Sequence, residues 1–279
     1  MRKLLHANFL RLKKDKYFWT GIVVMALYAI ADCAGQYNNM TRYEMTVSYD
    51  GVFFASHMVI GMLIAAFCSL YIGTEYSDGT IRNKLIAGCD RKSIYLSNFI
   101  TCTAAGVMMN TVYMLVAGIL GIPLFGFFES SMGAVLMNLL NSVLMTAAFT
   151  AVFTMLSMLD QNKALVAVIS MIGVFAAIIL ALYIAMKLGE KEFVDGAVMS
   201  KTVGDTTTQT IQKIPNPMYL KPAQRAAHQF VLDLLPTGQS LQIASLSVRN
   251  PWTLGAYSLI ITGVVNIVGV FCFKRKDLK

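Results

Sequence analysis

Long apolar runs alternate with short polar connectors along the chain. Six of these runs are long enough to cross the roughly 30 Å hydrocarbon core of a bilayer, which takes about 20 residues of α-helix. They cover residues 17–34, 52–72, 94–122, 132–159, 164–186 and 252–273. The pattern predicts an all-α polytopic membrane protein with six transmembrane helices, the third of which projects from the bilayer at one end.

An amphipathic stretch precedes the first apolar run. In residues 1–16, Leu5, Phe9 and Leu12 share one helical face, and most of the basic residues lie on the other face. We therefore expect residues 1–16 to form an interface helix at the membrane surface and residues 17–279 to form the membrane domain. On the residues alone, this helix is predicted to serve as a membrane anchor and a positive-inside signal.

The long segment 187–250 between the fifth and sixth runs carries a second amphipathic pattern. In PAQRAAHQFVLDLL, Phe230 and Leu234 share an apolar face, and Pro236 with Gly238 is expected to close that helix. A second short helix is expected over SLQIASLSV. Residues 191–217 are richer in Thr, Asp and Lys and are predicted to be mobile. The segment as a whole is predicted to be a small cap on the outer leaflet.

Composition agrees with this class of protein. Apolar residues make up 56% of the 279 residues, charged residues make up 14%, and the mean hydropathy is +0.60. A soluble domain of this length needs far more polar surface. The chain is therefore expected to be embedded in a membrane over most of its length.

Basic residues orient the predicted bundle, because Lys and Arg in short flanks are retained in the cytoplasm. More than half of the 23 basic residues lie in the N-terminal flank, in the connector after the second run and at the C-terminus, whereas the short opposite connectors carry only Arg42. Both termini are therefore predicted to be cytoplasmic. The net charge of +8 is explained by this topology, and it gives no reason to expect a nucleic-acid partner.

Cysteine and histidine positions do not predict a disulfide framework or a metal site. None of the five cysteines lies in the long outer segment, and the three histidines are far apart in the sequence. Polar residues inside the apolar runs are interpreted as sources of hydrogen bonds between helices, with Asp32 hydrated near the outer end. This group comprises Asn110, Asn138, Asn141, Asn266 and His57.

The connector EYSDGTIRNKLIAGCDR, residues 75–91, has the features of a short rigid helix. Thr80 is a suitable N-cap, residues 81–87 provide two turns, and Gly88 stands where a left-handed residue commonly ends a helix. Gly79 permits a sharp change of chain direction before the helix. Ile81 and Leu85, four residues apart, are expected to form a small apolar contact face.

The pattern E-Y-x-x-G-T-I-R-N-K-L-x-x-G followed by an arginine resembles the coupling segment of ABC-2 type transporter permeases. The six runs, the amphipathic N-terminus, LLPTGQ at residues 234–239 and the closing FKRKDLK are also similar to that family. The resemblance implies that this segment docks on a separate ATP-binding subunit, and that two permease subunits, identical or related, form the pathway. It also implies that the N-terminal helix acts as a lever at the boundary between the membrane and the ATPase. The residues it implicates in coupling are Glu75, Gly79, Thr80, Ile81, Arg82, Asn83, Lys84, Leu85 and Arg91.

The sequence contains no G-x-x-x-x-G-K-[ST] phosphate loop. We therefore expect this chain to be no enzyme by itself and to carry no cofactor, with ATP and magnesium bound by the partner. Three alternatives remain: an ion- or proton-coupled transporter or channel, an intramembrane enzyme, and a connector helix that simply lies on anionic lipid headgroups. The runs hold few charges and no paired acids, metal motif or G-x-S-x-G nucleophile, which favours the ATP-driven function.

The resemblance implies export of a cargo, and the apolar runs favour a hydrophobic or amphipathic one such as a peptide, an antibiotic or a lipid-like molecule. The expected location is the cytoplasmic membrane of a bacterium, in contact with its lipids.

Overall fold

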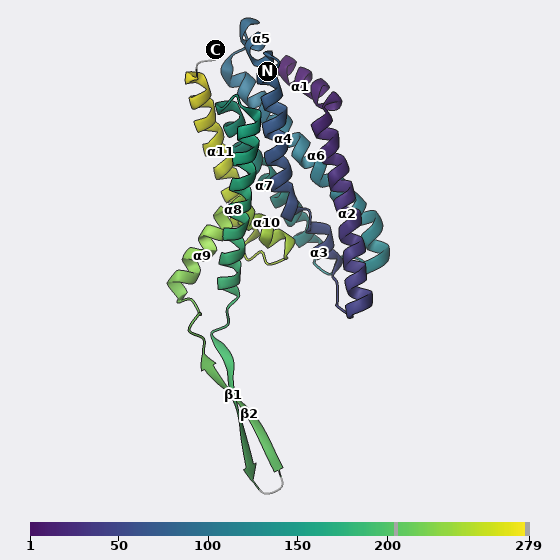
Figure 1. The fold of residues 1–279 in the computed structure, drawn as a ribbon, viewed down its shortest axis with the longest axis vertical. Helices are drawn as coiled ribbons and strands as arrows, with labels where there is room; N and C mark the ends of the chain where they lie inside the picture. The colour runs from purple at the N-terminus through teal and green to yellow at the C-terminus, as the bar shows by residue number, and fades with distance from the viewer. Residues whose placement is uncertain (204–205, 277–279) are drawn as a thin grey trace.

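The computed structural model describes residues 1–203 and 206–276, with side chains described outside 197–212. Long helices run side by side along one axis of the molecule (Figure 1). They are α2 (Lys16–Tyr43), α4 (His57–Ser77), α6 (Arg91–Phe125), α7 (Met132–Leu159), α8 (Lys163–Gly189) and α11 (Pro251–Arg275). Six segments are apolar and long enough to cross a membrane, the second including a short preceding helix. The predicted all-α polytopic membrane fold is confirmed.

Short helices gather at the two ends of this bundle. α1 (Arg2–Lys14) and α5 (Thr80–Ile86) lie at the end that carries both termini, here called the terminal end (Figure 1). α3 (Tyr49–Phe54), α9 (Pro222–Leu234) and α10 (Pro236–Ala244) lie toward the opposite end, the hairpin end. An even number of membrane crossings requires the two termini to lie on the same side, and here they do.

The second apolar run forms two helices where one was expected. α3 ends at Phe54 and α4 begins at His57, with Ala55 and Ser56 between them. The ring of His57 is hydrogen-bonded through Nδ1 to the Phe54 carbonyl at 2.7 Å, so this carbonyl has a partner at the break. Hydropathy is continuous across the break, and the run could therefore not reveal it.

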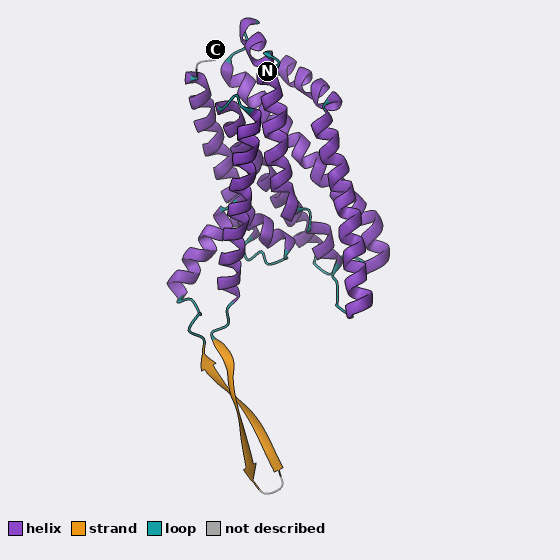
Figure 2. Ribbon diagram, in the orientation of Figure 1, coloured by secondary structure: helices purple, strands orange, loops and turns teal. Residues whose placement is uncertain are grey.

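A two-stranded antiparallel hairpin projects from the hairpin end (Figure 2). It consists of β1 (Phe193–Val203) and β2 (Thr206–Pro215), with Phe193 opposite Pro215 and one irregularity between Asp195 and Val198. The composition of residues 191–217 predicts a mobile segment and no strands. The segment is rich in Thr, Val and Ile, whose branched side chains favour extended backbone.

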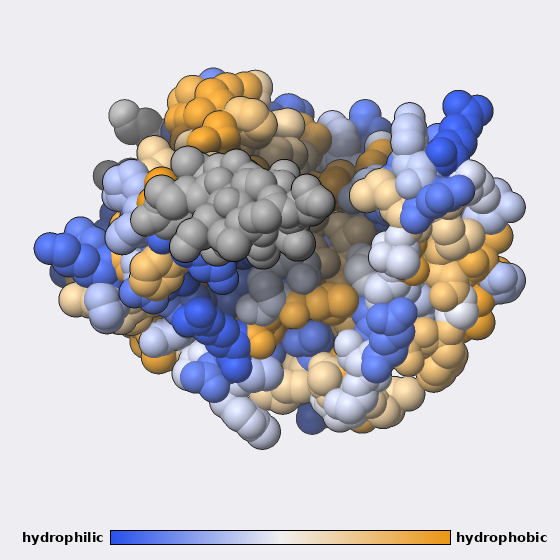
Figure 3. Space-filling view, turned by 90° about the horizontal axis from the view of Figure 1, so that it is seen from below, coloured by the Kyte–Doolittle hydropathy of each residue, from blue (hydrophilic) through white to orange (hydrophobic). Residues whose placement is uncertain are grey.

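α4 lies at the centre of the bundle, where it contacts α6, α7 and α8. Gly106 on α6 brings three helices together, because a Cβ atom there would lie 3.0 Å from Thr146 and 3.2 Å from Ile64. Small residues at such crossings allow close helix packing in membranes. The outer faces of α2, α8 and α11 expose apolar side chains, as lipid contact requires. Viewed from the hairpin end, the end of the bundle carries patches of hydrophilic residues, and hydrophobic residues lie along its sides (Figure 3).

Thiol labelling tests the orientation of the bundle. In a chain whose other four cysteines are replaced by serine, Cys89 is expected to react with an impermeant maleimide only after cells are permeabilised. Met218→Cys, at an exposed position before α9, is expected to react in intact cells of the same background without Cys89. Reaction of both thiols in intact cells would exclude the predicted topology.

Candidate functional site

α5 is a helix held between two glycines with left-handed backbone. Gly79 (φ 66°) is the N-cap and Gly88 (φ 81°) follows the C-cap. A Cβ at Gly79 would meet no atom within 4 Å, so glycine is favoured there by backbone conformation and not by lack of space. The Cys89 N–H donates to the Lys84 carbonyl at 3.0 Å and the Gly88 N–H to the Leu85 carbonyl at 2.9 Å. These bonds form a Schellman motif that fixes the end of the helix.

The side chains of α5 face differently from the prediction. Thr80 is the first helical residue and not the N-cap. Ile81 is 1% exposed and belongs to the core of the chain, and Leu85 packs partly against that core, so this apolar pair is not the free contact face that was expected. The exposed apolar residue is Ile86, at 78%. Ile86 forms, with the exposed Arg82 and Asn83, the surface called here the docking face.

Glu75, near the end of α4, is the centre of a buried ionic cluster. It is 1% exposed. Its Oε1 atom pairs with Arg11 from α1 and with Lys84 from α5. Its Oε2 atom accepts a hydrogen bond of 2.7 Å from Asn98 of α6. A single carboxylate therefore joins four helices at the base of α5, and it does not itself face a partner.

Asn8 of α1 completes this cluster. Its amide nitrogen donates to Asn98 Oδ1 at 2.8 Å, and its Oδ1 accepts from Lys84 Nζ at 3.0 Å. The Tyr71 hydroxyl donates to the Asn8 carbonyl at 3.0 Å. Asn8 is not among the residues predicted from the sequence. The available signal was an asparagine placed three residues after Leu5 and four before Leu12, inside the apolar stripe of the helix.

α1 packs against the bundle through the stripe that was predicted. Leu12 is buried, Phe9 packs partly against the core, and Leu5 is half-buried. Arg11 lies over the Tyr71 ring, 3.7 Å from its centroid, and donates to the Tyr71 carbonyl at 3.3 Å. α1 is thus fixed to the same helix ends as α5.

Arg91, the last residue of the predicted coupling set, faces the C-terminus of the chain. Its guanidinium donates to the carbonyls of Phe273 at 3.0 Å and Lys274 at 3.2 Å, and also to that of Lys276. Burial lowers the pKa of Lys276 from its usual value. Hydrogen bonds from Ser93 lower the pKa of Asp90, which caps α6. Because its guanidinium binds the last carbonyl groups of the helix, Arg91 terminates α11 and is not part of the docking face.

A hollow of about 240 Å³ opens beside α5. It lies between the start of α5 and the short connection from α7 to α8, and its walls are mainly polar. The lining residues are Glu75, Tyr76, Ser77, Gly79, Ile81, Arg82 and Gln161. The terminal end therefore offers both a protruding face and an adjacent recess.

The cap at the hairpin end differs in detail from the prediction. α9 ends at Leu234, and Pro236 is the first residue of α10, so Gly238 lies inside this second helix and does not close the first. Leu232, not Leu234, is the fully buried residue of α9. Phe230 is 51% exposed, and its ring lies 5.8 Å from that of Tyr257 on α11.

Gly238 permits close packing of α10 on α9. A Cβ there would lie 2.1 Å from the Leu232 carbonyl oxygen, a backbone atom with little freedom to move. Gly238→Ala is therefore expected to separate the two helices and to lower stability by about 1–3 kcal/mol. Thermal unfolding in detergent measures this loss. Gly133→Ala is the control, because no atom lies within 4 Å of its added Cβ, and equal melting temperatures for the two variants would contradict the cap packing.

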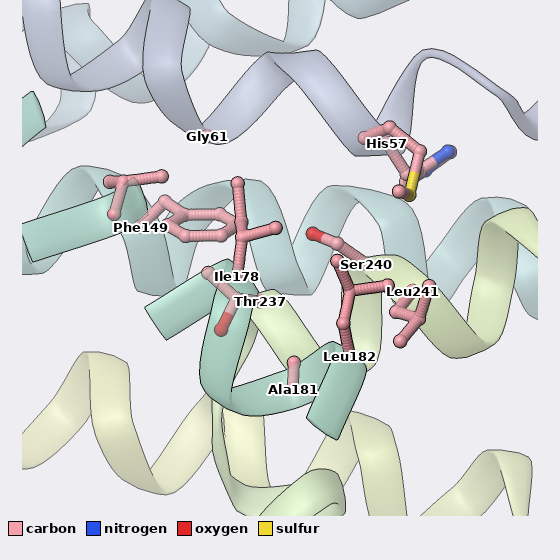
Figure 4. Close-up of a pocket in the computed structure, with 11 residues that line it drawn as sticks. His57, Gly61, Phe149, Ile178, Ala181, Leu182, Thr237, Ser240 and Leu241 are labelled. Atoms are coloured by element: carbon pink, nitrogen blue, oxygen red, sulfur yellow. The ribbon is translucent and has the colours of Figure 1, made fainter. Parts of the chain in front are cut away.

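A small cavity lies beneath α10, between α4, α7 and α8 (Figure 4). Its volume is about 10 Å³, so it does not hold a substrate in this conformation. His57 lines one end and takes part in a relay: Nδ1 donates to the Phe54 carbonyl, Nε2 accepts from Ser142 at 2.7 Å, and Asn110 donates to Ser142 at 2.8 Å. This relay joins α4, α6 and α7 by hydrogen bonds, as the sequence predicted for Asn110.

The described residues contain no cluster of three or more His, Cys, Asp or Glu side chains able to hold a metal ion. The structure is a multi-pass helical bundle with a short charged helix at one end and a pair of cap helices at the other. The chain belongs to the ABC-2 transporter family, because the family model described as ABC-2 family transporter protein matches residues 4–195. That match extends from α1 to the beginning of β1. No curated protein matches the chain.

Membership of this family supports the resemblance drawn from residues 75–91. ABC-2 permeases are membrane transport components that are not themselves catalytic, and they generally work with a separate ATP-binding subunit.

Proposed function

We propose that this chain is the permease subunit of an ATP-binding cassette exporter. A separate ATP-binding subunit would bind ATP and Mg²⁺ and dock on the docking face of α5. A second permease subunit, identical or related, would complete the pathway. The observation that carries this proposal is the buried cluster around Glu75, which makes α5 a rigid projection of the bundle.

Rigidity is the property that a coupling element needs. A flexible loop would absorb the movement of a docked ATPase, whereas a helix fixed at its base transmits that movement. Glu75 ties α5, through Lys84, to the ends of α4 and α6 and to α1. A lipid-surface helix would need none of these buried contacts, since headgroups hold such helices through exposed basic residues.

The docking face has the composition of a small protein contact. Ile86 supplies an exposed apolar side chain, and Arg82 and Asn83 supply polar groups around it. Asn83 can both donate and accept hydrogen bonds, and arginine binds carboxylates through two N–H groups at once. The recess beside α5 offers room for a partner side chain next to this contact.

The cargo pathway is proposed to lie between two permease subunits. The described part of one chain has an apolar cavity of about 10 Å³ beneath its cap, too small for a peptide. Apolar faces of α2, α8 and α11 are free to border lipid or a second subunit. These walls suit a hydrophobic or amphipathic cargo such as a peptide, an antibiotic or a lipid-like molecule, exported across the cytoplasmic membrane of a bacterium.

Transport into inside-out vesicles tests this function against the ion-coupled alternative. With the chain and its partner present, uptake of an amphipathic peptide should require hydrolysable ATP and should persist when a proton ionophore collapses the gradient. Uptake that fails with the ionophore and proceeds without ATP would identify a secondary transporter. Vesicles from cells that lack the chain are the control.

A further inference from the structure

α11 is attached to the terminal end by a set of polar contacts. Arg91 of α6 donates to the last carbonyl groups of the helix, including that of Phe273 at 3.0 Å. Lys276, directly after the helix, donates from Nζ to the Tyr76 hydroxyl and to the Met158 carbonyl, both at 3.2 Å. Tyr76 is the residue next to Glu75. The C-terminus of α11 is therefore held against the same helix ends that support α5.

The opposite end of α11 is attached to the cap. The Ser258 hydroxyl donates to Gln239 of α10 at 2.6 Å, and both residues are buried. The Tyr257 ring packs against Phe230 of α9. Asn141 of α7 donates to the Pro251 carbonyl at 3.0 Å. One turn of α11 is thus joined to both cap helices.

The middle of α11 lacks such attachments among the described residues. Asn266, its one amide side chain, donates to the Thr262 carbonyl of its own helix at 2.7 Å. Ile260, Val264 and Ile267 are exposed, as lipid-facing residues are. Between its two polar ends, α11 packs against α7.

We propose that α11 is a connecting rod between the coupling segment and the cap. Its 25 residues form one α-helix of about 37 Å, which is stiff on this length scale. A displacement of Tyr76 and Arg91 would move the C-terminus of the rod, and Ser258 would carry that displacement to α10. The role of Tyr76 and Arg91 in ATP-driven movement rests on the proposed function, whereas the mechanical link between the two ends of α11 does not.

Cysteine accessibility at the cap tests the rod without any nucleotide. Ala244→Cys, half-buried in the last turn of α10, reports movement of that helix through its rate of reaction with an impermeant maleimide. Arg91→Met removes the Arg91 contacts that hold the C-terminus of α11, and it is expected to raise this rate by about fivefold or more, the lower end of typical coupling between sites. Lys92→Met, an exposed neighbour, is expected to leave the rate unchanged. An unchanged rate in Arg91→Met at equal membrane abundance overturns the proposal.

Lys276→Met provides a second test should Arg91→Met fail to accumulate. It removes the two hydrogen bonds to Tyr76 and Met158 but leaves in place the three Arg91 contacts, which are to backbone carbonyls, and a smaller rise in the same direction is expected. An unchanged rate in Lys276→Met, when Arg91→Met cannot be measured, also overturns the proposal. Because these rates are recorded without ATP, they stand even if no ATP-binding subunit associates with the chain.

Discussion

Glu75→Gln is expected to destabilise the protein by about 3 kcal/mol or more, because it leaves two cations at a largely buried site without their carboxylate. Arg11 and Lys84 both pair with Glu75, and Lys84 has a side chain only 12% exposed. Thermal unfolding in detergent measures the change. The control is Asp78→Asn, an exposed acidic residue three positions later.

A double variant separates the ionic interaction from simple loss of packing. Lys84→Met combined with Glu75→Gln removes one of the stranded cations, so the pair of changes should cost less than the sum of the two single changes. Additive losses would show that the two side chains do not stabilise each other. A melting temperature of Glu75→Gln equal to that of Asp78→Asn would show that the cluster does not hold α5.

Ile86→Asp is expected to weaken association with the proposed ATP-binding subunit by about tenfold or more. An apolar side chain that becomes fully buried contributes about 1.5–3 kcal/mol, and about 1.4 kcal/mol corresponds to a factor of ten in affinity. Because Ile86 is exposed in the free chain, membrane abundance should not change. The amount of ATP-binding protein retained on the purified variant measures the effect.

Ile81→Asp is the comparison for this experiment. Ile81 is buried inside the chain, so a carboxylate there should reduce membrane abundance and stability and not act through docking alone. The opposite pattern, in which Ile81→Asp accumulates normally and releases the partner while Ile86→Asp retains it, would restore the contact face that the sequence suggested.

The spans could be predicted from the sequence because length and hydropathy alone decide them. Gly79 and Gly88 likewise marked the ends of α5, since few other residues adopt a positive φ. The inward face of α5 could not be predicted in this way. A seven-residue helix with apolar residues at 81, 85 and 86 has two possible apolar faces, and the contact of Lys84 with Glu75 selects one.

Long-range contacts explain the other differences. Asn8 is a single polar residue in an apolar stripe, and its importance depends on Asn98, ninety residues away. The role of Arg91 depends on the C-terminus of α11, and the position of Gly238 inside α10 depends on a backbone contact with Leu232. Local pattern carries no information about these partners, so the sequence could not predict the direction in which each residue of segment 75–91 faces.

The most direct test of the proposed function is the composition of the complex purified from its native membrane. The tagged chain, extracted in mild detergent, should retain a protein with a phosphate-binding loop at a fixed ratio to the permease. The purified complex should hydrolyse ATP. Recovery of the chain without any nucleotide-binding protein, from membranes in which it still transports its cargo, would contradict the assignment.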